Sequence, residues 1–397
     1  MEQALEGIMV VDFSTSMAGA WCSRLLADFG ADVVMVEPPG GHPLRQLAPH
    51  TKDGASIPAM YVQANKRSIA LELDQPTGRA VLADLIAASD VVIESTVPGT
   101  LAGWEMSFEE LEERRPGVIL VSVTPYGQDC ARAGYPGNDL TTYALSGWAS
   151  INGLADREPI KGSGFNASYL AGTAAYGATL TALCYREMHG IGQQIDIAEV
   201  ETQAEIFGRS MLRAQYEDAI PERNTEMHLT GSFPVPVKDG HIAVGLGSGY
   251  RFRDALNALG LPEMAEDAEL QNPSYRRDHP EAFVPQITAR LAEMNKAKLF
   301  DALARVRVGS GPVLTMDELA TDPHLRERGY YAPPTADPDG PEYPGAPFKM
   351  SQTPWHLERG APDRGAHTTE VMADVAGYGP TQIASLMERG IAIGATS

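Results

Sequence analysis

The chain has 397 residues, of which 43% are hydrophobic and 21% are charged, and its formal net charge is −21. These proportions are ordinary for a globular protein, and the length suffices for two domains or one large elaborated domain. So acidic a surface argues against nucleic acid or an anionic membrane as a partner. It would also repel a polyanionic ligand, unless basic residues cluster locally.

Targeting and metal-binding signals are not found in the sequence. The first 13 residues lack the basic stretch and apolar core of a signal peptide, and no run of about 18 apolar residues exists. Cys22, Cys130 and Cys184 are far apart and fit no metal-ligand spacing. We therefore expect a soluble, cytoplasmic protein with free thiols and no metal site.

The first half of the chain alternates between two kinds of predicted element. Short apolar runs predict buried strands at residues 8–13, 33–36, 91–93 and 118–123. Helical spacing of apolar residues predicts helices at residues 21–29, 78–88 and 107–114, the first of them ended by Gly30. Strands that alternate with helices predict an α/β fold, in which a parallel sheet is covered on both faces.

Two loops follow predicted strands, which is where phosphate-binding loops are found. The first strand–helix turn, residues 14–19, lacks the G-x-G-x-x-G pattern that brings a pyrophosphate against a helix end, which disfavours a nicotinamide or flavin cofactor. Residues 245–249 carry three glycines after a predicted strand at 241–244. Their spacing matches no phosphate loop, so we interpret them as a tight turn.

A long helix is predicted from Ser168 to Arg186, with Gly190 as its stop. Asn166 and Ser168 are both candidates for its N-cap, because their side-chain oxygens can accept bonds from free backbone N–H groups. A helix start at the end of a loop is also a place where anions are often held.

The remaining sequence predicts a second, smaller region and an extended tail. A strand at residues 194–197 precedes one long helix at 199–215 and an exposed connector at 222–230. A second α/β-like segment covers residues 232–325. Residues 330–362 are rich in Pro and Gly and predict an extended segment that wraps over other structure, and a last helix is predicted at 380–389.

A series of short motifs, in a fixed order over almost the whole chain, resembles the class III CoA-transferases, the family that includes carnitine dehydratase, bile-acid-inducible protein F and formyl-CoA transferase. Each motif alone is weak, but more than ten in the same order identify the family. They lie at residues 27–34, 36–45, 65–71, 89–94, 98–99, 126–128, 137–140, 146–147, 165–172, 189–197, 311–313, 322–325, 328–329, 347–351 and 365–368.

The resemblance implies a fold and an assembly. It implies a Rossmann-like large domain with a parallel sheet, formed by residues 1–225 with 330–397, and a smaller α/β domain of residues 226–329. Two such chains in this family thread through each other as interlocked, ring-like dimers. The Pro- and Gly-rich tail would suit that topology.

The resemblance also implies a departure at the active site. Ser168 stands where the family has the aspartate that attacks the acyl-CoA and carries the acyl group and then CoA. A serine cannot replace it, because an acyl-serine is an unactivated ester and serine has no carbonyl on which a thioester could form. No hydrolase-type G-x-S-x-G surrounds Ser168, and Asn138, Asp139 and Tyr143 are the nearest polar candidates by motif. We therefore interpret Ser168 as an inactive residue that caps its helix.

The family's contacts to coenzyme A or acyl-CoA would fall on six positions of this chain: Ala18, Arg45, Lys66, Arg67, Leu71 and Ser95. Other positions depart from the family pattern. Pro38 and Gly103 stand where basic residues are common, and Ser95 stands where an asparagine is common. Acyl-CoA racemases of the same superfamily need a His and an Asp where this chain has Asn138 and Ser168, which disfavours that chemistry.

Three hypotheses about the function remain open. In the first, the chain is a non-nucleophilic subunit, paired with a homologous chain that carries the aspartate, as in transferases of the succinyl-CoA:benzylsuccinate type. In the second, it is a stand-alone enzyme acting on acyl-CoA with altered chemistry, such as a lyase, hydratase or transferase, and assembles with itself. In the third, the fold serves binding or regulation outside CoA metabolism.

Overall fold

The computed structural model describes residues 3–220, 222–223, 234–246 and 251–395. The chain forms two compact units: residues 1–152, 159–222 and 329–397 make the first, and residues 153–158 with 223–328 make the second. The first unit contains a seven-stranded sheet in the order β12-β3-β2-β1-β4-β5-β6. All neighbouring strands in it are parallel except β12, which pairs antiparallel with β3.

The strands of this sheet are short. Their bounds are β1 Met9–Asp12, β2 Asp32–Glu37, β3 Arg67–Leu71, β4 Val91–Glu94, β5 Ile119–Thr124, β6 Gln193–Ala198 and β12 Ala392–Ile393. Five of them, β1, β2, β4, β5 and β6, lie close to the predicted positions, whereas β3 and β12 were not predicted. The order of the six parallel strands is that of doubly wound Rossmann sheets, in which the strand order reverses between the first and fourth strands. The predicted α/β class and parallel sheet are thus confirmed.

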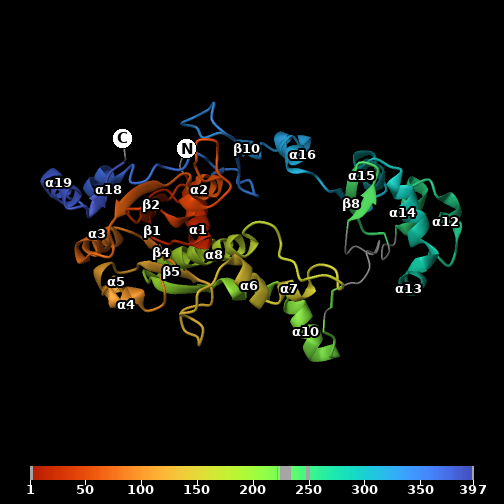
Figure 1. Cartoon of the computed structure of the whole chain (residues 1–397), viewed down its shortest axis with the longest axis horizontal. Coiled ribbons are helices and arrows are strands. Elements are labelled where there is room, and N and C mark those ends of the chain that lie inside the picture. The colour runs from red at the N-terminus through yellow and green to blue at the C-terminus, as the bar shows by residue number, and fades with distance from the viewer. Residues whose placement is uncertain (1–2, 221, 224–233, 247–250, 396–397) are drawn as a thin grey trace. The chain divides into compact units, whose positions relative to one another are not determined.

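Alternate residues of each strand enter two different cores, because successive side chains point to opposite faces. Val10, Val33 and Val91 belong to the core shared with α1 (Met17–Asp28) and α8 (Asn166–His189). Their neighbours on the same strands face a core completed by other helices. Those helices are α3 Pro76–Ala87, α4 Thr100–Gly103, α5 Phe108–Arg114, α18 Thr368–Asp374 and α19 Pro380–Glu388. Helix α8 packs against β5 and β6. Figure 1 shows it next to β5, with α3 and α5 on the left of the view.

The first unit also holds shorter elements around the carboxyl ends of the strands and in the tail. They are η1 Pro43–Gln46, α2 Ile57–Gln63, α6 Asp139–Leu145, α7 Trp148–Ile151, α9 Glu199–Glu205, α10 Gly208–Glu217, β10 Tyr331–Ala332 and β11 Tyr343–Pro344. The tail from residue 330 to 362 contains only the short β10–β11 hairpin and is otherwise irregular, as its composition predicted.

Two helix predictions need correction. Helix α1 begins at Met17 rather than Trp21, because the Ser16 hydroxyl accepts a bond from the Gly19 amide at 3.1 Å and caps the helix earlier. The single helix predicted at 199–215 is two helices, α9 and α10. The break falls at Ile206 and Phe207, directly before Gly208, a poor helix former.

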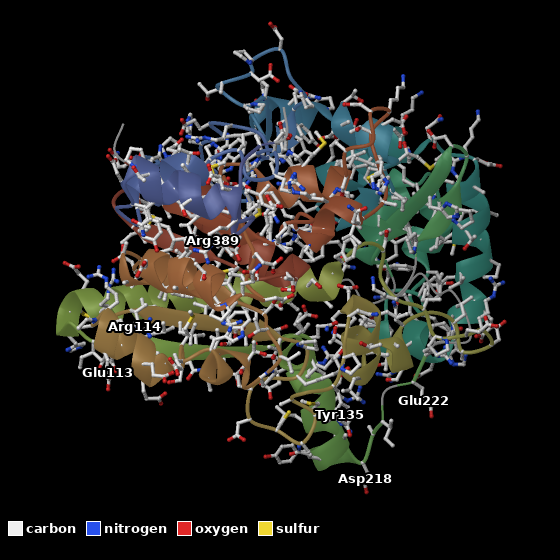
Figure 2. All side chains as sticks on the ribbon, turned by 60° about the vertical axis from the view of Figure 1, so that its left-hand side comes forward. Glu113, Arg114, Tyr135, Asp218, Glu222 and Arg389 are labelled. Carbon is white, nitrogen blue, oxygen red and sulfur yellow. The ribbon has the colours of Figure 1, made fainter. Side chains whose placement is uncertain are left out.

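Helix α10 buries none of its residues. Met211, Leu212 and Tyr216 on it are exposed, and Asp218, which follows its end, points outward in Figure 2. Exposed apolar side chains gathered on one helix are uncommon in a protein without a partner.

The second unit is a small α/β body with its own core. Its sheet is antiparallel in the order β7-β8-β9, unlike the parallel sheet of the first unit. Its elements are β7 Val235–Val237, β8 Gly240–Val244, α11 Phe252–Ala258, α12 Pro262–Glu266, α13 Pro273–Asp278, η2 Pro280–Ala282, α14 Val284–Ala292, α15 Lys296–Arg305, β9 Ser310–Pro312, α16 Met316–Ala320 and α17 Pro323–Glu327. The glycine turn predicted at 245–249 and the connector predicted at 222–230 lie mostly outside the described residues.

Candidate functional site

A cavity of about 550 Å³ lies in the first unit, at the carboxyl ends of β1, β4, β5 and β6. Ligands of open α/β sheets bind at this edge, where the strand order reverses. The loops that follow these strands supply Thr15, Ser95, Pro125 and Glu199. The described residues that line the cavity are Thr15, Ser16, Met17, Leu44, Leu47, Ser95, Val123, Pro125, Gly137, Asn138, Asp139, Leu140, Lys161, Gly164, Phe165, Ser168 and Glu199.

Ser168 lies in this lining, on the first turn of α8, and is 5% exposed. It is not the helix cap that the sequence predicted. Helix α8 starts at Asn166 with Phe165 as its N-cap, and no side chain of that residue caps it. The Ser168 backbone N–H instead donates to Asp139 Oδ1 at 3.0 Å. The prediction was wrong because the helix begins two residues earlier, so that a carboxylate from another helix, α6, satisfies the free N–H.

The Ser168 hydroxyl is close to a carboxyl group that the sequence analysis missed. Ser168 Oγ lies 3.4 Å from Glu199 Oε1, and Thr142 Oγ1 lies 3.3 Å from Glu199 Oε2. Burial of Glu199, with a smaller contribution from the nearby Asp139 charge, raises the pKa of its carboxyl to about 7. Glu199 directly follows Ala198, the last residue of β6, and this position at the carboxyl end of a parallel strand was the available signal.

Asp139 and Lys161 form an ion pair at the wall of the cavity. Lys161 Nζ lies 2.6 Å from Asp139 Oδ2. The same ammonium also donates to the carbonyl oxygens of Gly162, at 3.0 Å, and Gly164. Asp139 therefore links the loop before α8 to the first turn of that helix through both of its carboxylate oxygens.

The other polar candidates near Ser168 have structural partners. Asn138 caps α6 by accepting bonds from the Leu140 and Thr141 amides. Tyr143 is buried, and its hydroxyl accepts a bond from Asn152 at 2.9 Å. Of the three candidates, Asn138 and Asp139 line the cavity.

Of the six positions expected to contact coenzyme A, Ser95 lines the cavity together with Ser168. Its Oγ accepts a bond from the Thr15 amide at 2.8 Å. Ala18 and Leu71 are fully buried in the two cores of the sheet.

The three basic residues among those six positions pair with carboxylates of the chain. Arg45 binds both oxygens of Glu37, each at 2.8 Å. Arg67 pairs with Asp32 at 2.5 Å and with Glu370 at 3.0 Å. Lys66 is fully buried beside Asp12, at 3.3 Å, and burial lowers the pKa of its ammonium to about 8. None of the three is among the residues that line the cavity.

The fold agrees with the comparisons to known proteins. The model of CoA-transferase family III matches residues 5–368, and the chain belongs to this family. A CaiB/BaiF family protein from Brucella suis has a similar crystal structure, with a TM-score of 0.84, 26% identity and coverage of 94% of this chain and 100% of that one.

Two curated relatives extend over nearly the whole chain. A succinate–glutarate CoA-transferase of Agrobacterium fabrum is 32% identical over 94% of this chain and 95% of its own length. The BbsE subunit of the succinyl-CoA:(R)-benzylsuccinate CoA-transferase of Thauera aromatica is 31% identical over 98% of both chains.

Across the described ranges, no helix combines the length and hydropathy that a membrane crossing requires.

Proposed function

We propose that the chain is the non-nucleophilic subunit of a hetero-oligomeric CoA-transferase that moves CoA between an acyl-CoA donor and a carboxylic acid. The observation that carries this proposal is the serine at position 168, in the lining of the cavity, where the family resemblance calls for the nucleophilic aspartate. The similarity to BbsE, a protein named as a subunit, supports the same assignment.

The chemistry of CoA transfer gives the reason. An acyl group taken from a thioester by a carboxylate becomes a mixed anhydride, which is reactive enough to be attacked by the released CoA thiolate. The same group on a serine hydroxyl becomes an ordinary ester, and the thiolate cannot form a thioester with the serine itself. With Ser168 as the nucleophile, the transfer would therefore go no further than the acyl-serine ester.

The charges of the chain support a passive role as well. Arg45, Lys66 and Arg67 are engaged with carboxylates of the chain, so CoA phosphates would have to compete for them. A charge-assisted bond to phosphate contributes roughly 1.5–3 kcal/mol, and each one that is missing weakens CoA binding by that order. The exposed apolar side chains of α10 support an assembly in which a second chain covers them.

The partner would be a homologous chain that carries the aspartate, or, in the stand-alone alternative, a second copy of this chain. A cytoplasmic location is part of the same proposal. Cys22, Cys130 and Cys184 are all free thiols, which suits a reducing compartment.

The test is co-expression with a homologous, aspartate-bearing chain encoded nearby. We expect the two chains to co-purify, and CoA transfer to need both. Ser168→Ala in this chain should leave the transfer rate of the complex within about twofold, whereas replacing the partner's aspartate by asparagine should abolish it. A well-folded homo-oligomer that never associates with the homologue would overturn the proposal.

A second candidate, a stand-alone enzyme on acyl-CoA, is favoured by one observation. The Glu199 carboxyl faces the same cavity, and its pKa of about 7 is in the range of a general acid or base at neutral pH. Calorimetry of the isolated chain with CoA and several acyl-CoAs tests it, since the absence of binding at millimolar ligand excludes it.

Ser168→Asp tests whether the rest of a transferase site is present in the isolated chain. We expect no transferase activity, because the new carboxylate would lie beside Glu199 and Asp139, and three neighbouring carboxyls do not ionise together readily. Activity in this variant would mean that only the nucleophile had been lost.

A further inference from the structure

Among the described residues that line the cavity, Lys161 is the single cationic side chain. An ammonium has three N–H groups. Lys161 donates to the Gly162 and Gly164 carbonyls, and its charge forms an ion pair with Asp139 Oδ2 at 2.6 Å. A carboxylate that entered the cavity would therefore have to compete with Asp139 for the charge of the lysine.

The start of helix α8 is occupied in the same way. A helix N-terminus attracts anions through its free backbone N–H groups. Here the Asp139 carboxylate already accepts the Ser168 N–H, at 3.0 Å. The protein's own carboxylate thus fills the position in which the carboxylate of a ligand would be stabilised.

Glu199 adds a second carboxyl to the wall. Its two oxygens face the hydroxyls of Ser168 and Thr142, and the described contacts of Glu199 include no cation. The neutral polar residues of the lining, among them Thr15, Asn138 and Ser95, can still serve an uncharged ligand. The described lining of the cavity therefore has two carboxyl groups, Asp139 and Glu199, and one lysine, which is already paired with Asp139.

We infer that this cavity accepts an uncharged acyl group and rejects a carboxylate, whether free or at the far end of an acyl chain, and that Glu199 sets this preference. The inference rests on the proposed function, since it takes the acyl end of acyl-CoA as the occupant. It deepens that function: such a subunit could hold an acyl-CoA but could not receive the acceptor acid, and transfer would have to be completed elsewhere.

The preference depends on pH in a definite direction. The charged and titratable groups around Glu199 are Asp139 on α6 and Lys161 on the loop before α8, with the hydroxyls of Thr142 and Ser168 beside it. The Asp139–Lys161 pair is internally neutralised, so the change of charge comes from Glu199. With a pKa of about 7, its carboxyl is mostly neutral at pH 6 and mostly ionised at pH 8. Repulsion of a ligand carboxylate therefore grows as pH rises.

The experiment compares two stable ligands that differ only at the end of the chain, S-butyl-CoA and S-carboxypropyl-CoA. Calorimetry measures both dissociation constants with the full-length protein at pH 6 and pH 8. The ratio of the two constants cancels the titration of the CoA phosphates, which both ligands share. We expect S-butyl-CoA to bind at least about tenfold more tightly at pH 8. If the ionised form of Glu199 excludes the carboxylate, this ratio should shrink by up to about tenfold at pH 6.

Glu199→Gln and Glu201→Gln form a matched pair of variants on helix α9. Glu201 is exposed and does not line the cavity, so its variant should keep the wild-type behaviour. In Glu199→Gln the ratio should lose its dependence on pH and stay near the wild-type value at pH 6. If Glu199→Gln does not fold, the comparison of the wild type at pH 6 and pH 8 still tests the inference.

Three results would overturn the inference. They are equal or tighter binding of S-carboxypropyl-CoA by the wild type at pH 8, an unchanged pH dependence in Glu199→Gln, and failure of both ligands to bind at millimolar concentration. The subunit proposal fails on a different observation, the absence of association with an aspartate-bearing homologue. The two failures can therefore be told apart.

Discussion

Two lysine–aspartate pairs lie in the first unit, and they differ in what surrounds them. Lys66 and Asp12 are 0% and 1% exposed at 3.3 Å, and protein groups complete the shell: Ala20 O and Gln63 Oε1 accept from the lysine. Lys161 and Asp139 are 20% and 8% exposed at 2.6 Å, and they border a cavity that also holds Glu199. The first pair is enclosed by protein, whereas the second faces space for a ligand.

This difference separates a structural ion pair from a candidate site, although both consist of the same residue types. The Asp12 carboxylate also accepts bonds from Ser14 and Ser23, so both of its oxygens have partners within the protein. At the cavity, the Glu199 carboxyl is buried beside open space and its pKa is raised toward 7. A strongly shifted acid next to a cavity is a candidate for a functional residue.

The largest effect is expected at the enclosed pair. Lys66→Met removes the partner of a buried carboxylate and should lower the free energy of unfolding by about 3–5 kcal/mol, measured by urea denaturation. Arg67→Met is the matched control, because the carboxylates that it pairs with are each 51% exposed, and it should cost no more than about 1 kcal/mol. If the two variants lost equal free energy of unfolding, the enclosed Lys66–Asp12 pair would be no more important for stability than the exposed ion pairs of Arg67.

An effect of about 2–3 kcal/mol is expected at Glu199 and depends on pH. Its pKa rises from 4.5 to about 7 on folding, so between these values the folded state binds more protons than the unfolded state. The wild type therefore loses stability through this group as pH rises from 5 to 8, whereas Glu199→Gln does not. Urea denaturation of both proteins at pH 5 and pH 8 measures this effect. The free energy of unfolding of the variant, relative to that of the wild type, should be about 2–3 kcal/mol higher at pH 8 than at pH 5. A constant difference would mean that the Glu199 carboxyl is not perturbed.

A smaller effect is expected where α8 crosses α1 and places Ser168 at the cavity. A Cβ at Gly172 would lie 2.5 Å from the Ala18 carbonyl oxygen and 3.0 Å from Trp21, whereas a Cβ at Gly177 on the same helix would meet nothing within 4 Å. Gly172→Ala should therefore cost about 1–3 kcal/mol of stability. Gly177→Ala should stabilise by up to about 1 kcal/mol through helix propensity. Thermal melts of the two variants measure both changes in stability. If the two melting temperatures shifted in the same direction, the tight crossing of α8 and α1 would be contradicted.

The family prediction from the sequence rested on motif order, and the family match over residues 5–368 confirms it. Several local predictions also hold. Gly30 and Gly190 follow the ends of α1 and α8 with φ of 103° and 71°, conformations that glycine adopts without strain. The helix cap assigned to Ser168 failed, because satisfying a free N–H requires only an acceptor nearby in space, and Asp139 provides one from 29 positions away.

The sequence by itself determined the strand–helix alternation, the parallel sheet and the family, since these depend on local periodicity and on motifs in a fixed order. Only the tertiary structure decided that Asp139, Lys161, Ser168 and Glu199 meet at one cavity, and that Arg45, Lys66 and Arg67 pair with carboxylates instead. Ser168 and Glu199, which are 31 positions apart, come into contact because helix α8 begins and strand β6 ends at the same edge of the sheet. Periodicity reports which face of its own element a residue occupies, but not which distant residue lies opposite.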